Sequence, residues 1–461
     1  MTAVKEDYDA VWRMLKARRV AVVGASQDPT KFSGVLVPSI IAGGFTGDVF
    51  PVNPTADVVA GLKAYPSVSD IPGTLDLVVI AVPARFVPGI LHEAADKGAA
   101  GAVVISAGGR ESGRPEFDKE ILEIARDRGL RLLGPNIQGF AYGPNRLSAV
   151  FWPVVTEHGP LAVVGQSGTV VAALTDWAQD DGLGVSASIS LGNQADICES
   201  DVVRLMAEDE HTGVTALYLE GLDDGPRFVA AIKDVAMQKP LVVLKCGRSE
   251  RGRAAVASHT GSLAGADRVF TGVCRQFGVV RAEDSEGLYD AAKILACMPL
   301  PSGRRVLVVS SSGGSCALAA DAGDANGLVL PDLPEDYVAG LRELGLAEWG
   351  SFANPLDMAS MAVEHFRTAV RMADAVDLAD VILLMFGDPI VGSAELAAEL
   401  AAESRACICA AYYGGGAVEQ TERRRMQRAG VPVFPSPERA MRAIGASCWY
   451  AERQRRWRVE R

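Results

Sequence analysis

A single histidine, His259, lies in a run of small residues, ASHTGSLAG, that extends from Ala257 to Gly265. Small residues allow backbone N–H groups to approach an anion closely, and a neutral imidazole is a competent acceptor of a phosphoryl group. A lone histidine in such a run is more often a turn or helix-start residue, so the rest of the chain must decide. The run therefore raises phosphoryl transfer through His259 as a hypothesis.

Three glycine- or serine-rich turns each follow an apolar, strand-like segment and precede a helical one. Such turns bind phosphates in α/β proteins, because a helix N-terminus beyond the end of a strand offers unpaired N–H groups. One turn alone is weak evidence, since every strand-to-helix connection needs a tight turn. Three in one chain predict a protein that handles a nucleotide or a phosphate. The turns are Gly24–Gln27, Gly165–Gly168 and Ser311–Ser315.

The second turn is predicted to hold phosphoryl oxygens. Its backbone N–H groups and the positive end of the following helix suit an anion, and the hydroxyls of Ser167 and Thr169 add donors. The alternative is that Ser167 only caps the helix. The candidate phosphate-binding residues are Gln166, Ser167, Gly168 and Thr169.

The elements that position these turns are predicted to be parallel α/β sheets. Hydrophobic residues make up 49% of the chain and aromatic residues only 6%, so the cores must consist of Ala, Val, Leu and Ile. Short β-branched runs alternate with helical stretches of ~10–15 residues, which indicates βαβ units. The predicted strands are Arg19–Val23, Val49–Val52, Leu77–Val82, Ala102–Ser106, Arg131–Leu133, Leu161–Val164, Val185–Ser190, Val214–Glu220, Pro240–Lys245, Arg305–Ser310, Val381–Phe386, Ala406–Tyr412 and Val431–Phe434.

The 461 residues suffice for about three domains. We predict domains at 1–145, 146–300 and 301–461, each with one of the three turns near its start. The proline-containing segments 141–159 and 298–303 are predicted to be linkers.

Charge and cysteine usage exclude several classes of partner. A formal net charge of −12 argues against nucleic acid and anionic membranes, which need a basic face. No uncharged apolar run reaches the ~20 residues of a membrane helix, and the first twenty residues do not resemble a signal peptide. The eight cysteines are widely spaced without a C-x-x-C pair, which predicts a reduced, cytoplasmic protein with no metal site on this chain.

The first turn departs from the dinucleotide-binding fingerprint. The sequence GASQ at 24–27 does not follow G-x-G-x-x-G, and Asn53 with Pro54 stands where an NAD enzyme places an acidic ribose ligand. Asp48 and Asp57 flank that position without occupying it. An NAD-dependent oxidoreductase therefore fits the chain poorly.

Several further motifs occur along the chain in one order. They are PVNP at 51–54, AVP at 81–83, VISAG at 104–108, LLGPN at 132–136, SLGN at 190–193, LEG at 219–221 and VVLK at 242–245. With the His259 run they resemble the NDP-forming acyl-CoA synthetases. That family includes the ADP-forming acetate–CoA ligases and, more distantly, the α subunit of succinyl-CoA synthetase. The resemblance implies a Rossmann-like CoA-binding domain followed by two flavodoxin-like domains.

In the first domain, the resemblance implies that the loops at strand ends hold CoA. Lys31 is expected to pair with a phosphate of CoA. Related enzymes often carry Cys after the PN dipeptide, whereas Ile137 and Gln138 follow Asn136 here, so we expect a differently lined site for the thiol end. The implied CoA-binding residues are Gly24, Ala25, Ser26, Lys31, Asn53, Pro83, Ser106, Ala107 and Asn136.

A carboxylate must be activated before it reacts with a thiol, and phosphorylation to an acyl phosphate achieves this. By resemblance, His259 carries the phosphoryl group from the nucleotide to the carboxylate. Glu220 then holds the other ring nitrogen and so fixes the tautomer. On the residues alone, Glu220 suits a charge at the start of the next helix equally well. Segment 246–258 lacks periodicity and is predicted to be a mobile loop.

The resemblance implies the α subunit of an ADP-forming acyl-CoA synthetase. This ligase converts a small carboxylic acid, CoA and ATP to acyl-CoA, ADP and phosphate. The sequence shows no Walker A run and no ATP-grasp module, so ATP/ADP and Mg²⁺ are expected on a separate ATP-grasp β subunit in an α2β2 hetero-oligomer. The alternatives are a non-catalytic CoA-binding or regulatory protein of the same fold, and a related acyl or carbamoyl transferase. The presence of both His259 and Glu220 argues against the non-catalytic alternative.

Overall fold

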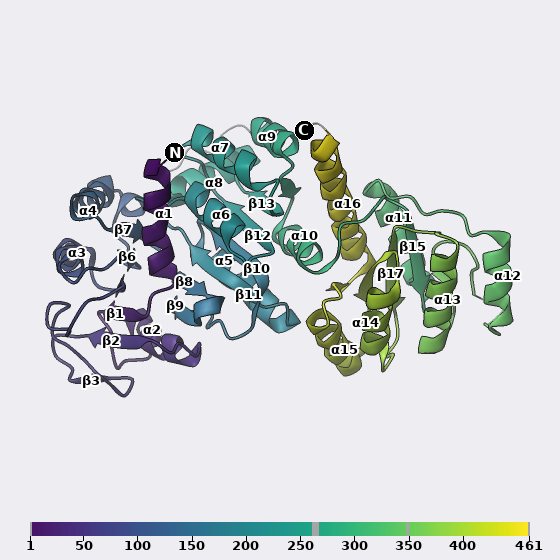
Figure 1. Cartoon of the computed structure of the whole chain (residues 1–461), viewed down its shortest axis with the longest axis horizontal. Coiled ribbons are helices and arrows are strands. Elements are labelled where there is room, and N and C mark those ends of the chain that lie inside the picture. Colours follow the sequence, from purple (N-terminus) through teal and green to yellow (C-terminus); the bar gives the residue numbers. More distant parts are fainter. Residues whose placement is uncertain (1, 261–266, 347–349, 460–461) are drawn as a thin grey trace. The chain divides into compact units, whose positions relative to one another are not determined.

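The structure is a computed structural model that describes residues 2–260, 267–346 and 350–459 (Figure 1). It divides into two compact units, one of residues 1–179 and 184–277 and the other of residues 180–183 and 278–461. Both are α/β units with parallel sheets, as predicted. The division of the chain at 145 and 300 stays a prediction.

The first sheet of the first unit is entirely parallel, in the order β2-β1-β5-β6-β7. Its central strands are buried on both faces, which explains their continuous Val, Ile and Ala runs. Helices α3 and α4 lie side by side and pack on it through Leu91 and Ile121 (Figure 1). The elements are α1 (Thr2–Leu15), β1 (Arg19–Val23), α2 (Phe32–Ala42), β2 (Asp48–Val52), β3 (Val58–Val59), β4 (Leu62–Lys63), β5 (Leu77–Ile80), α3 (Val87–Asp96), β6 (Gly101–Val104), η2 (Arg110–Ser112), α4 (Pro115–Arg128) and β7 (Arg131–Leu133).

The second sheet of this unit has the order β13-β12-β10-β11-β8-β9. The strands from β10 to β13 are parallel, whereas β8 and β9 form an antiparallel hairpin at the edge of β11. The elements are β8 (Gly139–Tyr142), β9 (Leu147–Val150), β10 (His158–Gly165), α5 (Gly168–Asp181), β11 (Val185–Ser190), α6 (Glu199–Glu208), β12 (Val214–Leu219), α7 (Gly225–Val235), β13 (Leu241–Lys245), α8 (Glu250–Thr260) and α9 (Asp267–Phe277).

Two predictions about this unit were wrong. Much of the predicted linker at 141–159 is β structure, because Phe140, Tyr142, Leu147 and Ala149 are all buried in the hairpin. The predicted mobile loop at 246–258 is helical from Glu250 onward. Its alanines favour a helix, and the Ser249 hydroxyl accepts a hydrogen bond from the Gly252 backbone N–H at 3.0 Å, which caps the first turn.

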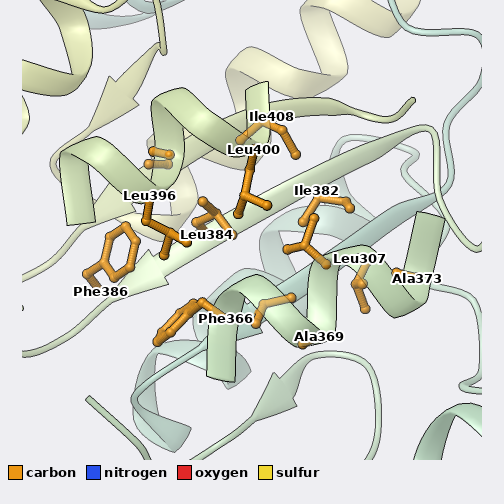
Figure 2. Close-up of a cluster of buried hydrophobic side chains, with 14 of the residues drawn as sticks. Leu307, Phe366, Ala369, Ala373, Ile382, Leu384, Phe386, Leu396, Leu400 and Ile408 are labelled. Carbon is orange, nitrogen blue, oxygen red and sulfur yellow. The ribbon is translucent and has the colours of Figure 1, made fainter. Parts of the chain in front are cut away.

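The sheet of the second unit is parallel, in the order β16-β15-β17-β18-β19. Helices α13 and α14 contact each other and pack on the same face of β17, and Figure 2 shows Phe366, Leu384 and Leu396 in this core. The elements are β14 (Val280–Ala282), α10 (Ser285–Cys297), β15 (Val306–Ser310), α11 (Gly313–Ala325), α12 (Glu335–Glu343), β16 (Leu356–Asp357), α13 (Val363–Ala375), β17 (Val381–Phe386), α14 (Ser393–Glu403), β18 (Cys407–Tyr412), α15 (Gly416–Arg428), β19 (Val433–Phe434) and α16 (Pro437–Val459).

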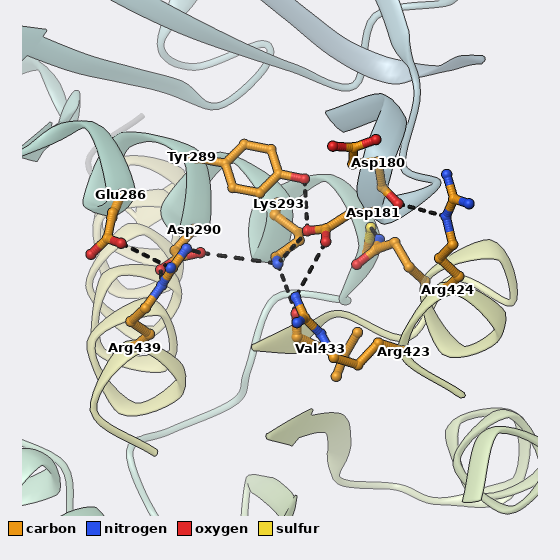
Figure 3. Close-up of polar contacts among 12 residues, drawn as sticks. Asp180, Asp181, Glu286, Tyr289, Asp290, Lys293, Arg423, Arg424, Val433 and Arg439 are labelled. Carbon is orange, nitrogen blue, oxygen red and sulfur yellow. Dashed lines mark hydrogen bonds and ion pairs between the residues drawn. The ribbon is translucent and has the colours of Figure 1, made fainter. Parts of the chain in front are cut away.

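A buried polar network also stabilises the second unit (Figure 3). Lys293 of α10 is fully buried and donates to Asp181 at 3.0 Å and to the Val433 carbonyl at 2.7 Å. Arg439 of α16 makes a two-pronged ion pair with the buried Asp290 at 2.7 and 2.9 Å. Because each buried charge has a partner, the network holds α10 and α16 together rather than destabilising the core.

Candidate functional site

One pocket of about 720 Å³ in the first unit brings together most of the residues predicted to bind CoA and phosphate. The loops after β5, β6 and β7 form one wall, and the first turn of α5 forms another. Parallel strands of two different sheets therefore direct their carboxyl ends to the same cavity. The lining residues predicted from sequence are Lys31, Pro83, Ser106, Ala107, Asn136, Gln166, Ser167, Gly168 and Thr169.

The turn before α5, residues 166–169, lines the pocket and also caps the helix. The Ser167 hydroxyl accepts a hydrogen bond from the Val170 backbone N–H at 3.4 Å, which is the contact that the capping alternative predicted. Gly168 begins the helix, and the positive end of the α5 dipole faces the pocket residues. Anion binding at this turn stays a prediction, and the position of the turn at the start of a helix is consistent with it.

The side chain of Gln166 ties this turn to the residue predicted to orient the histidine. Its Oε1 accepts hydrogen bonds from the backbone N–H groups of Glu220, at 2.5 Å, and Gly221, at 3.0 Å. Its Nε2 donates to the Gly221 carbonyl at 2.9 Å and to Gln194 at 2.6 Å. Glu220 itself is only 5% exposed. The turn before α5 and the Glu220 loop are therefore fixed to each other.

The strand end beside Glu220 carries a thiol that is not activated. Burial raises the pKa of Cys246, and the hydrogen bond with Tyr218 only partly opposes this shift. A protonated thiol is a poor nucleophile. The raised pKa therefore disfavours the thiolate form of Cys246.

Asn136 is held in the pocket by a chain of polar contacts. Its Nδ2 donates to Asn193 at 3.3 Å, and Asn193 in turn donates to Glu111 at 2.6 Å and to Asp118 at 3.1 Å. Burial alone would raise the pKa of Glu111, but hydrogen bonds from Asn193 and the Gly108 N–H lower it. Burial raises the pKa of Asp118. The hydrogen bonds that Glu111 accepts from Asn193 and from the Gly108 N–H therefore favour its charged form and anchor this loop.

Other residues predicted to bind CoA lie elsewhere. Gly24 and Pro83 line a second, largely apolar pocket of about 420 Å³, which shares Val82 and Pro83 with the first. Of the described residues predicted to bind CoA, Ala25, Ser26 and Asn53 line neither of these two pockets. Asn53 donates to the Ala25 carbonyl at 2.8 Å and accepts from the Thr55 N–H at 2.9 Å. Its side chain thus joins the loops after β1 and β2.

The backbone of His259 lies in the last turn of α8, but its side chain falls outside the described part of the chain. Residues 261–265, the rest of the histidine run, are also outside that part. The helix that carries His259 contacts η2, which follows the Ser106 loop of the pocket. No described geometry joins the imidazole to Glu220, so that pairing stays a prediction.

Sequence reasoning missed an aromatic wall of the pocket. Phe32 and Phe151 both line it, with ring centroids 4.8 Å apart, although Phe32 is 70% exposed. No signal in the sequence distinguishes these two phenylalanines from core residues, because the exposure of Phe32 is a property of the fold. Gln138 also lines the pocket. Sequence reasoning noted this residue only because related enzymes often carry Cys near this position.

Comparison with known proteins agrees with this architecture. A CoA binding domain model matches residues 18–142, and a succinyl-CoA ligase like flavodoxin domain model matches residues 158–295. The chain is 36% identical to the α subunit of acetate–CoA ligase [ADP-forming] I of Pyrococcus furiosus, covering 94% of this chain and 96% of that one. It is 35% identical to acetate–CoA ligase [ADP-forming] I of Archaeoglobus fulgidus, covering 97% of this chain but 65% of that longer protein.

Solved structures give the same assignment. Dinucleotide forming acetyl-coenzyme A synthetase 1 of Candidatus Korarchaeum cryptofilum, solved in complex with phosphate and ADP, matches with a TM-score of 0.88. It is 33% identical, and the match covers 98% of both chains. This chain belongs to the NDP-forming acyl-CoA synthetase family, together with the ADP-forming acetate–CoA ligases.

Proposed function

We propose that the chain is the α subunit of an ADP-forming acyl-CoA synthetase, which converts a carboxylic acid, CoA and ATP to acyl-CoA, ADP and phosphate. One observation carries the proposal. Five of the nine residues predicted for CoA and all four predicted for phosphate at α5 line a single pocket. A thiol and an acyl phosphate held there would be neighbours, which is the geometry that thioester formation needs.

The proposed chemistry has three balanced steps. His259 attacks the γ-phosphorus of ATP, and ADP leaves. A carboxylate oxygen then attacks the phosphohistidine, which gives an acyl phosphate and restores the imidazole. Finally, the CoA thiol loses its proton and attacks the acyl carbon, and phosphate leaves. Glu220 is the proposed acceptor for the other ring N–H of His259, and the N–H groups from Gln166 to Thr169 are the proposed donors to the phosphoryl oxygens.

The two pockets suit the two ends of CoA. We propose that the apolar pocket at Gly24 and Pro83 takes the adenine, while the pantetheine arm enters the larger pocket. The aromatic wall of Phe32 and Phe151 would then pack against the arm. Lys31 is exposed at the rim and is the proposed partner of a CoA phosphate.

The nucleotide step is proposed to need a partner. The P. furiosus relative is named a subunit α, which supports a separate partner subunit for this chain. We propose an ATP-grasp β subunit that binds ATP and Mg²⁺ in an α2β2 assembly. Within the described residues, no helix combines the length and apolar character needed to cross a bilayer. A cytoplasmic location remains part of the proposal.

Reconstitution tests the function. Purified chain, an ATP-grasp subunit, ATP, Mg²⁺, CoA and a panel of carboxylic acids are expected to give acyl-CoA and ADP in equal amounts. The chain alone is expected to bind CoA in calorimetry, in preference to NAD, but to release no ADP. CoA binding with no turnover for any acid in the complete mixture would support the non-catalytic alternative. Acyl transfer without ADP release would support a transferase.

A further inference from the structure

Gln138 has a buried polar atom in the pocket that no described residue satisfies. Its amide oxygen Oε1 is buried and accepts no hydrogen bond from the described part of the chain. Among the residues that line the pocket, all of them described, this is the only buried side-chain polar atom in that condition. By contrast, the amides of Asn136 and Gln166 in the same pocket are hydrogen-bonded. An unsatisfied buried carbonyl is unfavourable in the free protein, so a ligand donor is the natural partner.

The protein fixes where this amide lies. The Gln138 backbone N–H donates to the Ser190 hydroxyl at 3.4 Å, and its carbonyl accepts from the Phe151 N–H at 3.4 Å. The side chain crosses the first turn of α5, because a Cβ on Gly168 would lie 2.4 Å from Cγ of Gln138. Gly168 thus leaves room for this side chain. The unsatisfied oxygen therefore sits beside the turn that receives the phosphoryl group.

The chemistry of the substrates leaves few donors for this oxygen. Carboxylate and acyl phosphate oxygens act as acceptors, and a carbonyl oxygen repels them. The pantetheine arm of CoA carries amide N–H groups, and only two methylene groups separate the last of them from the sulfur. When the thiol reaches an acyl phosphate at the α5 turn, this last N–H comes within reach of a neighbouring side chain.

We propose that the Gln138 Oε1 accepts a hydrogen bond from the pantetheine amide N–H nearest the thiol, and so positions the sulfur for attack. The inference rests on the proposed function, because it assumes that CoA enters this pocket. Gln138 is then a CoA-positioning residue. Gln138→Leu removes the acceptor and also the unsatisfied carbonyl. The variant should therefore bind CoA more weakly while its melting temperature rises.

A ligand–variant cycle tests the proposal on the full chain. Calorimetry measures the dissociation constants of CoA and of an analogue in which an ester oxygen replaces that amide N–H. We expect the analogue to bind wild type roughly fivefold to tenfold more weakly than CoA. In Gln138→Leu, CoA and the analogue should bind equally. Gln238→Leu, the same change at an exposed site in the turn after α7, is the matched control and should behave as wild type.

Each outcome decides the question. The proposal is supported if Gln138→Leu binds CoA and the analogue equally while wild type and Gln238→Leu still prefer CoA. Equal discrimination in wild type and Gln138→Leu overturns it, because the N–H would then have another partner. A lower melting temperature with unchanged CoA affinity overturns it as well and makes Gln138 a packing residue. If wild type binds neither ligand, the proposed function fails rather than this assignment alone. Gln138→Met repeats the cycle if the leucine variant does not fold.

Discussion

Replacing Gln166 by Leu should separate the turn before α5 from the Glu220 loop. The substitution keeps the size of the side chain but removes its polar end. Four hydrogen bonds end at that amide, two donated by the backbone N–H groups of Glu220 and Gly221 and two donated to the Gly221 carbonyl and to Gln194. Both backbone positions are buried, so water cannot simply replace the lost partner.

The magnitude follows from this count. A net contribution of about 1 kcal/mol per hydrogen bond, with an added cost for buried groups left unsatisfied, gives a loss of roughly 3–5 kcal/mol in the free energy of unfolding. Gln166→Glu should lose about half as much, because a carboxylate still accepts from the two N–H groups but cannot donate. Phosphorylation of the chain should also slow, since Glu220 would no longer be held in place.

Urea denaturation measures the stability, and incorporation of phosphate from labelled ATP, with the partner subunit, measures the phosphorylation. Gln238→Leu serves as the matched control for both. An unfolding free energy of Gln166→Leu within error of wild type would refute the reasoning, because it would mean that the four contacts are not made. If Gln166→Glu is as stable as wild type while Gln166→Leu is strongly destabilised, the stabilisation comes only from the two hydrogen bonds that Oε1 accepts from the Glu220 and Gly221 N–H groups.

Three further predictions concern other groups. His259→Asn should abolish the acid-labile, base-stable phosphate label, whereas His211→Asn should retain it, and labelling of the first variant would exclude His259 as the carrier. Lys293→Met should lower the free energy of unfolding by roughly 3 kcal/mol, because Asp181 loses one of its two cationic partners and keeps only Arg423, and an unchanged denaturation midpoint would contradict this. Burial raises the pKa of Asp181, but the charges of Lys293 and Arg423 outweigh burial, so the pKa in the folded protein is lower than the ordinary value. The stability that the Asp181 carboxylate contributes is therefore present above its ordinary pKa and is lost as the pH falls through the lower folded value. Unfolding measured from pH 6 to pH 3 should thus show a smaller acid loss in Asp181→Asn than in wild type.

The part of the fold that could be predicted consists of elements with a simple apolar pattern that recurs along the chain. Strands such as β1, β5 and β17 are continuous apolar runs buried on both faces, and that pattern is visible in the letters alone. The β8–β9 hairpin was missed because Pro144 and Pro153 indicate a linker, while its burial depends on pairing with β11. Helix α8 was missed because its glycine and arginines mask a run of alanines.

For the site, sequence reasoning found the residues in loops but not their side-chain roles. It identified Asn53 as a ligand residue, and the structure uses its amide to join two loops. It could not anticipate that Gln166 would hold the Glu220 loop, since the two lie 54 positions apart and meet only through the β10–β12 register. A buried lysine such as Lys293 likewise has no sequence signal, because its burial depends on Asp181 and Val433, both distant along the chain.

The sharing of one pocket by two sheets limits how this protein can be recombined. A fragment ending at 145 would carry β8 without β11 and would lack the Gln166–Thr169 wall. In a chimera that replaces only the segment matched by the CoA binding model, 18–142, with that of a relative, positions 136 and 138 would come from the relative. The residue at position 138 would then have to pack against Gly168 of this chain. Transplants should therefore exchange the strand-end loops and the start of α5 as one module. In evolution, the same constraint would couple substitutions at 138 and 168, although the two positions belong to different domain families.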